Sequence, residues 1–277
     1  MGASSKGAAS VAAPDERKEF FEREGYLIVE NVLSGEEVAA CQAEIGRLHD
    51  LYVELEKSDD PAQKQFQREP YAKGDRDTPV LRKIEQTGSV SEVFGNLAKH
   101  STLIAVVKDL LGPDLLQFRS TLMLKPALHG SVHALHQDSA YWSMEPPTLV
   151  TVSIALNDTN EENGCIQVIP RSHTGGLEDW GQIAREQQAA LTDREDVSAT
   201  DLVPVPVRAG TALLFHSMLV HGSGPNRSPN PRNTALYAYF PPTVRYCPRK
   251  NQPSEQTFRV VDGCGGAEEV VMKAIED

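Results

Sequence analysis

The feature that most constrains the fold is a series of short apolar runs after Pro113, separated by turn-forming residues such as Asn163-Gly164 and Ala209-Gly210. Many short strands divided by such turns are typical of a sandwich or barrel, of which the double-sheet jelly roll is one form. The expected strands cover residues 115–118, 121–125, 133–138, 149–156, 165–169, 202–207, 211–215, 219–221 and 234–240. The sequence therefore predicts a mainly β protein.

Helices are expected before this β region. Residues 15–24 are predicted to form a short charged helix, which Gly25 can end in the left-handed conformation. A strand is expected at residues 26–30. Ser34 and Glu37 then form a capping box. The helix that follows places apolar side chains on one stripe, at Val38, Cys41, Ile45, Leu48, Tyr52 and Leu55.

Two more helices are expected within residues 90–111, divided near Ser101, which could cap the second. We expect the flanking helices to pack on one sheet of the β core. Residues 56–77 and 176–200 are polar and are predicted to be a long loop and an insertion on the rim of the core.

The division of the chain follows from these elements. We expect a disordered N-terminus at residues 1–14 and a single domain over 15–277. That domain would comprise a helical part at 15–113, a β core at 114–242 and a C-terminal extension at 243–277.

The charge and the cysteines limit the partners and the compartment. A net charge of −12 argues against nucleic acid and against an anionic membrane surface. No apolar run reaches the ~20 residues of a membrane helix. The cysteines, Cys41, Cys165, Cys247 and Cys264, are far apart and are expected to be reduced in a cytoplasmic protein. The oligomeric state stays open.

A candidate metal site lies in His136-Gln137-Asp138. On a strand, His136 and Asp138 would point to the same side, with Gln137 on the other. One imidazole and one carboxylate are two of the three ligands of a two-histidine-one-carboxylate iron(II) site. The third candidate is His221, in the segment LVHGSGPN. A histidine-x-aspartate triplet alone is common, so the prediction depends on this distant partner.

The order of several motifs resembles that of the phytanoyl-CoA dioxygenase family. The motifs are HQD at 136–138, ENGCIQVIPRSH at 162–173 and LVHGSGPNRS at 219–228, with an arginine eleven residues after His221. Residues 21–45 resemble the N-terminal block of the family, and the resemblance covers roughly residues 16–245. It implies an iron(II)- and 2-oxoglutarate-dependent oxygenase on a double-stranded β-helix, a cupin-like jelly roll.

The resemblance also implies roles for individual residues. His136, Asp138 and His221 match the iron ligands. Arg232 matches the arginine that binds the distal carboxylate of 2-oxoglutarate, and Ser223 matches its hydroxyl partner. A guanidinium suits this role because it makes bidentate bonds to a carboxylate. Thr151 matches a position where a hydroxyl often helps to hold the co-substrate, and Met123 lies at a pocket-lining position. Glycine is frequent in the family where this chain has Arg171, which affects only the local turn.

Four residues are candidates for contact with the substrate: Tyr141, Trp142, His133 and Trp180. For Tyr141 and Trp142 the alternative is a role as core aromatics. For His133 it is a place in the pocket wall without a metal, and for Trp180 it is anchoring of the 176–200 insertion.

The resemblance implies that O2 and 2-oxoglutarate are co-substrates, that succinate and CO2 are formed, and that an unactivated C–H of a small organic substrate is hydroxylated. Acyl, amino-acid and secondary-metabolite derivatives are all candidate substrates. Asp138 argues against halogenation because related halogenases carry a small residue there. Desaturation, epoxidation and cyclisation stay open. The alternatives are a non-catalytic metal-binding jelly roll and a cupin-like isomerase or hydrolase.

Overall fold

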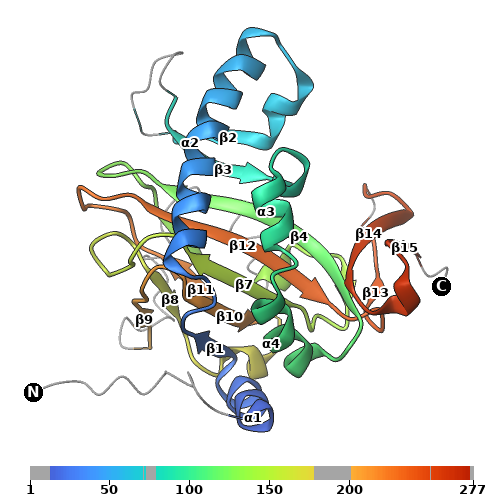
Figure 1. Ribbon diagram of the computed structural model, residues 1–277. Helices are drawn as coiled ribbons and strands as arrows, with labels where there is room; N and C mark the ends of the chain where they lie inside the picture. The colour runs from blue at the N-terminus through green and yellow to red at the C-terminus, as the bar shows by residue number, and fades with distance from the viewer. Residues whose placement is uncertain (1–12, 71, 73–78, 178–200, 250, 275–277) are drawn as a thin grey trace, which may run out of the picture.

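The structure, a computed structural model, describes residues 13–70, 72, 79–177, 201–249 and 251–274. A large antiparallel sheet forms its centre, and helices cover one face of that sheet (Figure 1). A smaller antiparallel sheet packs on the opposite face. This arrangement confirms the predicted jelly-roll core with N-terminal helices on one sheet.

The large sheet has the order β1-β10-β7-β12-β4-β14-β15, and the hairpin of β2 and β3 joins it through β4. Its strands are β1 (Tyr26–Val29), β2 (Phe66–Arg68), β3 (Leu81–Glu85), β4 (Leu115–Lys125), β7 (Val150–Ala155), β10 (Ala212–His216), β12 (Arg232–Phe240), β14 (Glu255–Asp262) and β15 (Glu269–Lys273). Every pairing in this sheet is antiparallel, as the alternating apolar and polar strand residues favour.

The small sheet has the order β5-β11-β8-β9. Its strands are β5 (His133–His136), β8 (Ile166–Val168), β9 (Val203–Val205) and β11 (His221–Ser223). Val168 and Val205 of this sheet share an apolar cluster with Leu213 and Phe215 of β10, which joins the two sheets. A separate two-stranded sheet pairs β6 (Met144–Glu145) with β13 (Arg245–Tyr246).

The helices begin and end close to the expected residues. They are α1 (Pro14–Glu24), α2 (Gly35–Lys57), α3 (Glu92–Leu97) and α4 (Ser101–Leu111). Gly25 ends α1 at φ 81°, and the capping box of Ser34 and Glu37 is present. The predicted cap at Ser101 is wrong: the residue before α4 is His100, whose side chain makes no capping bond, and Ser101 is the first helical residue. None of the described helices has the length and apolar character needed to cross a membrane.

Alternation along the central strands separates the helix side of the large sheet from its inner side. On β4, Leu122 and Leu124 pack into the cluster that contains the helices, whereas Thr121 and Met123 line a pocket on the other side. Successive strand residues point to opposite faces, so one strand contributes side chains both to the helix-covered core and to the pocket. The pocket is therefore the inner space of the jelly roll, between the two sheets.

Several elements differ from the sequence prediction. The two expected strands at 115–118 and 121–125 are one strand, β4. The segment 56–77, expected to be a loop, contains the 3-10 helix η1 (Pro61–Gln65) and β2, and β2 pairs with the unexpected strand β3. Strands β14 and β15 in the C-terminal extension were also unexpected. Polar and charged residues interrupt the apolar positions of these strands, so their apolar periodicity is weak.

Parts of some predictions lie outside the described residues. These are the N-terminus at 1–12, most of the insertion at 178–200, and Trp180 within it.

Two buried tyrosines connect the large sheet to α3. Tyr237 Oη donates to the carbonyl of Phe94 at 2.9 Å, and Tyr239 Oη donates to the carbonyl of Ala98 at 2.8 Å. Both tyrosines are fully buried. Tyr239 therefore pairs the Ala98 carbonyl at the end of α3, and Tyr237 gives the Phe94 carbonyl a second donor besides the Ala98 N–H.

We expect the double variant Tyr237→Phe/Tyr239→Phe to lower the free energy of unfolding by about 1–3 kcal/mol, because the Ala98 carbonyl is left unpaired, which costs about that much. The Phe94 carbonyl keeps its bond from the Ala98 N–H. Urea unfolding followed by circular dichroism measures this. Tyr246→Phe is the control, since that hydroxyl bonds Pro253 at a less buried position. Equal midpoints for the double variant and the control would contradict the assignment.

Candidate metal centre

His136, Asp138 and His221 meet at the inner side of the small sheet. Their ligand atoms lie within 4.8 Å of one another. Asp138 Oδ1 is 3.5 Å from His136 Nε2 and 4.0 Å from His221 Nε2. The two imidazole centroids are 4.3 Å apart. Three donors at this separation can all contact one ion, because bonds to imidazole nitrogen and carboxylate oxygen are about 2 Å long.

Strand pairing explains how residues so distant in sequence come together. β11 pairs antiparallel with β5, and His221 is directly opposite His136. Asp138 is not on the strand as predicted: β5 ends at His136, and Asp138 begins the 3-10 helix η3 (Asp138–Ala140). Gln137 does point away, as expected, and its amide donates to the carbonyl of Met218 at 2.7 Å. This bond holds the turn after β5 against the start of β11.

Hydrogen bonds orient each ligand. His136 Nδ1 is 2.8 Å from the carbonyl of Ala134, and His221 Nδ1 is 2.9 Å from that of Leu219. Each carbonyl accepts the Nδ1 proton, which leaves Nε2 free to bind a metal. Thr151 Oγ1 donates to Asp138 Oδ2 at 2.6 Å, so Oδ1 is the oxygen that faces the histidines.

Charge also prepares two of the three ligands, Asp138 and His221. Burial would raise the pKa of Asp138, but the contacts with His136, His221 and Thr151 lower it to about 2. Burial lowers the pKa of His221 to about 4, and the neighbouring His136 adds to this effect. Asp138 is thus a carboxylate and His221 a neutral imidazole at neutral pH, which are the forms that bind metal. The donor set of two imidazoles and one carboxylate fits iron(II).

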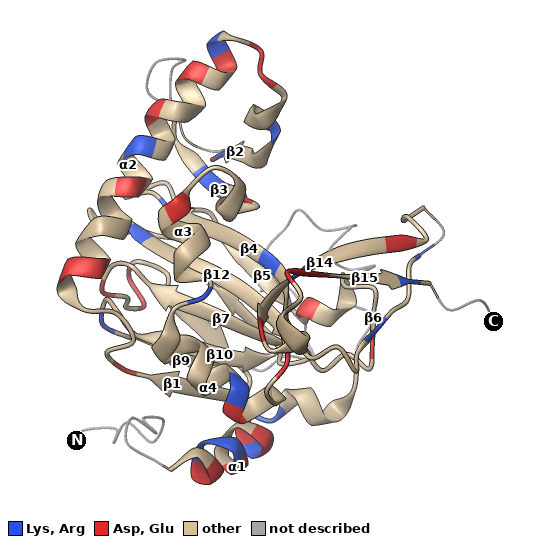
Figure 2. Ribbon diagram, turned by 45° about the vertical axis from the view of Figure 1, so that its right-hand side comes forward, with Lys and Arg blue, Asp and Glu red and all other residues tan. Residues whose placement is uncertain are grey.

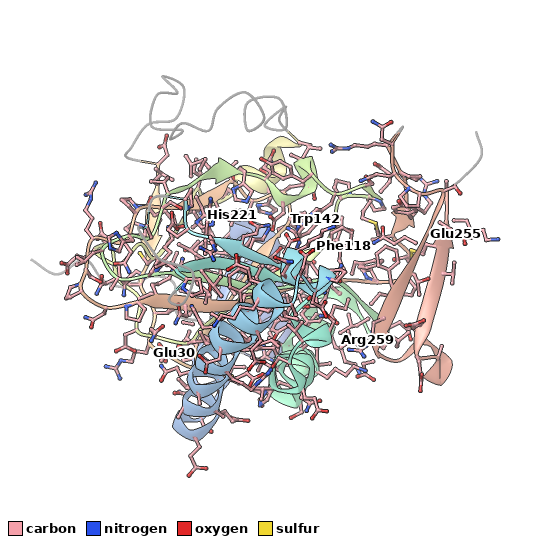
Figure 3. All side chains as sticks on the ribbon, turned by 90° about the horizontal axis from the view of Figure 1, so that it is seen from above. Glu30, Phe118, Trp142, His221, Glu255 and Arg259 are labelled. Atoms are coloured by element: carbon pink, nitrogen blue, oxygen red, sulfur yellow. The ribbon has the colours of Figure 1, made fainter. Side chains whose placement is uncertain are left out.

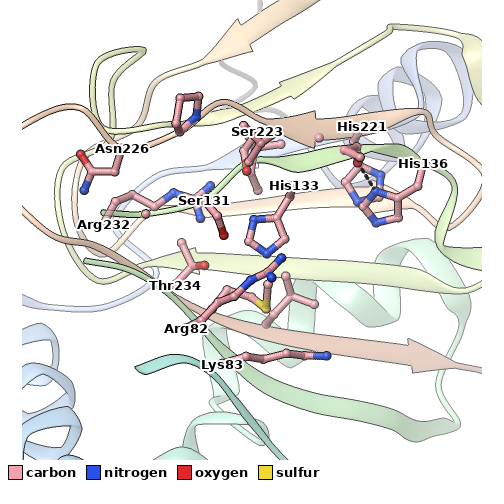
Figure 4. Close-up of a pocket in the computed structure, with 18 of the residues that line it drawn as sticks. Arg82, Lys83, Ser131, His133, His136, His221, Ser223, Asn226, Arg232 and Thr234 are labelled. Atoms are coloured by element: carbon pink, nitrogen blue, oxygen red, sulfur yellow. Dashed lines mark hydrogen bonds between the residues drawn. The ribbon is translucent and has the colours of Figure 1, made fainter. Parts of the chain in front are cut away.

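The metal ligands border a cavity of about 1190 Å³. Arg232, Ser223, Met123 and His133 line it, and Figure 4 shows Ser223 between Arg232 and His221. Three of the predicted co-substrate residues, Arg232, Ser223 and Met123, therefore line the same cavity as the predicted iron ligands. Thr151 is not among the lining residues, and its contact is with Asp138.

Arg232 carries a buried charge without a partner. Only 3% of the residue is exposed, and neither Nε nor Nη2 has a hydrogen-bond partner among the described residues. Burial lowers its pKa to about 10, so the guanidinium stays charged at neutral pH. Burial, with the charge of Arg232, lowers the pKa of the adjacent Lys125 to about 6. An unpaired buried guanidinium is unfavourable, so a bound carboxylate fits this position.

The predicted substrate residues fall into two groups. His133 and Tyr141 line the pocket, and the Tyr141 ring is 6.0 Å from that of His136. Trp142 instead belongs to the core, the alternative role that the sequence left open. It is 7% exposed and its ring is 4.7 Å from Phe118, beside which Figure 3 shows it.

Sequence reasoning missed three cationic residues in the pocket: Arg82, Lys83 and Arg119. Arg82 and Lys83 are on β3, which was not expected to be a strand, and Arg119 lies between two segments of β4 that were expected to be separate. The signal that could have found Arg82 and Lys83 is the run LRKIE, in which the apolar residues Leu81 and Ile84 enclose the two cations.

The fold and the site define a jelly-roll protein with a two-histidine-one-carboxylate centre. Comparison with known proteins adds the family. The model of the family described as phytanoyl-CoA dioxygenase (PhyH) matches residues 21–234. An ectoine dioxygenase of Bordetella parapertussis is 26% identical over 265 residues, which are 87% of this chain and 82% of that protein.

Two solved structures have a similar fold. EctD from S. alaskensis with bound Fe is 25% identical, with a TM-score of 0.66, and the match covers 90% of this chain and 85% of that one. The non-heme alpha ketoglutarate dependent epimerase SnoN from nogalamycin biosynthesis is also 25% identical, with a TM-score of 0.64 and coverages of 85% and 83%. This chain belongs to the phytanoyl-CoA dioxygenase family. It is an iron- and 2-oxoglutarate-dependent oxygenase, as the motifs predicted.

We expect Thr151→Val to weaken iron(II) binding by about 10–100-fold, because the loss of a partner that orients a ligand has effects of that size. The shape of the side chain is kept, while Asp138 Oδ2 loses its donor. Anaerobic iron titration measures the affinity. Ser153→Ala, two residues along the same buried strand, is the control. Unchanged iron affinity in Thr151→Val would show that the hydroxyl does not position Asp138.

Proposed function

We propose that this protein hydroxylates an unactivated C–H bond of a small organic substrate. The reaction would consume one O2 and one 2-oxoglutarate and release succinate and CO2. The observation that carries the proposal is the buried guanidinium of Arg232, which has no ion-pair partner among the described residues and lines the same pocket as the three metal ligands. A protein that only bound metal would not need a buried cation placed to hold a dicarboxylate.

The roles of the residues follow from their positions. His136, Asp138 and His221 would hold iron, which when bound supplies the activation of O2 and the oxidative decarboxylation of 2-oxoglutarate. Arg232 would bind the distal carboxylate of 2-oxoglutarate, and Ser223 would donate a hydrogen bond to it from β11. Met123 supplies apolar wall beside them. The buried walls exclude water, which strengthens each of these polar contacts.

Other outcomes of the same chemistry remain alternatives. One solved relative is an epimerase by its description, so the family fold supports more than one reaction. Desaturation, epoxidation and cyclisation of the substrate are the proposals that compete with hydroxylation, and product mass distinguishes them. A non-catalytic metal-binding jelly roll is the rival of a different class. It predicts no succinate under any condition.

We also propose that residues 15–277 act as one catalytic unit in the cytoplasm. All four cysteines are free thiols, two of them buried, which supports a reducing compartment. Cell fractionation tests the compartment.

We expect Arg232→Gln to raise the apparent KM for 2-oxoglutarate at least about thirtyfold, because loss of a buried charged contact costs about 2–5 kcal/mol. The KM for the organic substrate should change far less. Steady-state succinate release measures both constants. Arg227→Gln is the control, since Arg227 also lines the pocket but is exposed. If Arg227→Gln shows the larger effect, Arg227 is the anchor.

We expect His221→Ala to lose both bound iron and succinate formation, because two ligands remain where three are needed. Iron content per chain and turnover are the measurements. His216→Ala is the control, because His216 lies on β10 outside the metal site and accepts from the backbone of Met218. Full iron and activity in His221→Ala would overturn the ligand assignment.

A further inference from the structure

The charges that line the pocket are strongly one-sided. Asp138 is its one carboxylate among the described lining residues, whereas five lining residues are lysine or arginine: Arg82, Lys83, Arg119, Arg227 and Arg232. The chain as a whole, by contrast, has a net charge of −12. Figure 2 shows basic residues on β3 and β4, and a mixture of acidic and basic residues along α1 and α2. The surplus of positive charge is therefore local.

The proposed function accounts for only part of this charge. Iron(II) would be balanced in part by Asp138, and 2-oxoglutarate carries two negative charges, one of which would pair with Arg232. The proposed function assigns neither group to Arg82, Lys83 or Arg119, which line the same pocket. Lys83 Nζ is 2.5 Å from Glu85 Oε1, and Arg119 Nη2 is 3.7 Å from the same oxygen. A single carboxylate thus serves two cations, and Arg82 has no ion-pair partner in the described part of the chain.

An irregularity in strand β3 directs two consecutive cations into the pocket. β2 pairs with β3 at Gln67 and Lys83 and next at Arg68 and Leu81, so Arg82 is an extra residue without a partner. Such a bulge changes the direction of side chains. In a regular strand Arg82 and Lys83 would point to opposite faces. Here both line the pocket, while Leu81 and Ile84 on either side are buried with the helices.

Further groups in the pocket lack partners next to these cations. His133 Nε2 and Thr121 Oγ1 are buried, line the cavity and have no hydrogen-bond partner among the described residues. Figure 4 shows Arg82 extending from β3 toward the His133 ring, with Lys83 on the same side of the pocket. Arg82 and His133 thus meet in the region between Arg232 and the two metal-binding histidines.

We propose that Arg82, Lys83 and Arg119 bind an oxyanion carried by the organic substrate, so that the substrate is an acid, a carboxylate or a phosphate ester. This inference rests on the proposed function and names its substrate class. Arginine suits the task because its guanidinium makes paired bonds to carboxylate and phosphate oxygens. Binding the charged group here would fix the orientation of the remainder of the substrate toward the metal ligands.

The test uses fluorinated carboxylates and fluorinated phosphate esters as probes, each matched by a neutral amide or methyl ester. Fluorine NMR relaxation reports their binding to the anaerobic protein loaded with iron(II) and 2-oxoglutarate. We expect the anions to bind at least about tenfold more tightly than their neutral partners. The two kinds of probe distinguish a carboxylate from a phosphate as the preferred group.

Variants locate the site. Arg82→Gln and Arg119→Gln should reduce anion binding about tenfold or more, and Arg82→Lys should retain part of it. Arg208→Gln is the matched control, because Arg208 is an exposed arginine outside the pocket. Each variant should keep the iron content, the circular dichroism spectrum and the 2-oxoglutarate affinity of the original protein. Equal binding of charged and neutral probes, or anion binding unaffected by both glutamine variants, would overturn the proposal.

Two comparisons separate this inference from the proposed function. If Arg82→Gln weakens 2-oxoglutarate binding as strongly as Arg232→Gln does, Arg82 holds the co-substrate, and the inference is wrong while the oxygenase assignment stands. The probe titration is repeated without 2-oxoglutarate. Anion binding that depends on Arg82 but not on Arg232 supports the inference even if 2-oxoglutarate fails to bind, an outcome that would refute the proposed function alone.

Discussion

The pairing of β5 with β11 is the interaction on which the rest of the site depends. It places His136 opposite His221 across a pair of short strands, and the turn after β5 adds Asp138. Strands this short are held in register by their surroundings more than by their own hydrogen bonds. The amide of Gln137 and the apolar cluster between the sheets provide that support. The metal ligands are thus fixed by the pairing and packing of the jelly roll and by the bonds of Gln137 to the carbonyls of Met218 and Gly176.

Two neighbouring cationic residues, Arg232 and Lys125, are buried. Arg232 is desolvated and unpaired, and Lys125 beside it is buried with its amine on the carbonyls of Ser131 and Gly224. Burial of unpaired charge costs free energy, which other packing in the domain must offset. In the proposed function a dicarboxylate would pair with this charge, and because the site is already arranged, little ordering would accompany binding.

The sequence predicted the chemistry of the site better than its local geometry. His136, Asp138 and His221 could be assigned because their residue types and order are specific, and most strands of the core have clear alternation. We expected Asp138 on a strand, because residues two apart on a strand point to the same side, but it lies in a 3-10 turn. Trp142 could not be distinguished from a pocket aromatic, because packing against Phe118 depends on tertiary structure. Arg82 and Lys83 were missed because a bulge has no periodic signal.

The hairpin of β2 and β3 has a consequence for how enzymes of this fold could diversify. It joins the large sheet only through β4 and contributes no metal ligand, yet two of its side chains reach the reaction space. Insertion or deletion of one residue at the bulge would rotate Arg82 or Lys83 out of the pocket and leave the iron site intact. Substrate preference could therefore be exchanged between relatives by grafting one short hairpin, independently of the machinery that activates oxygen.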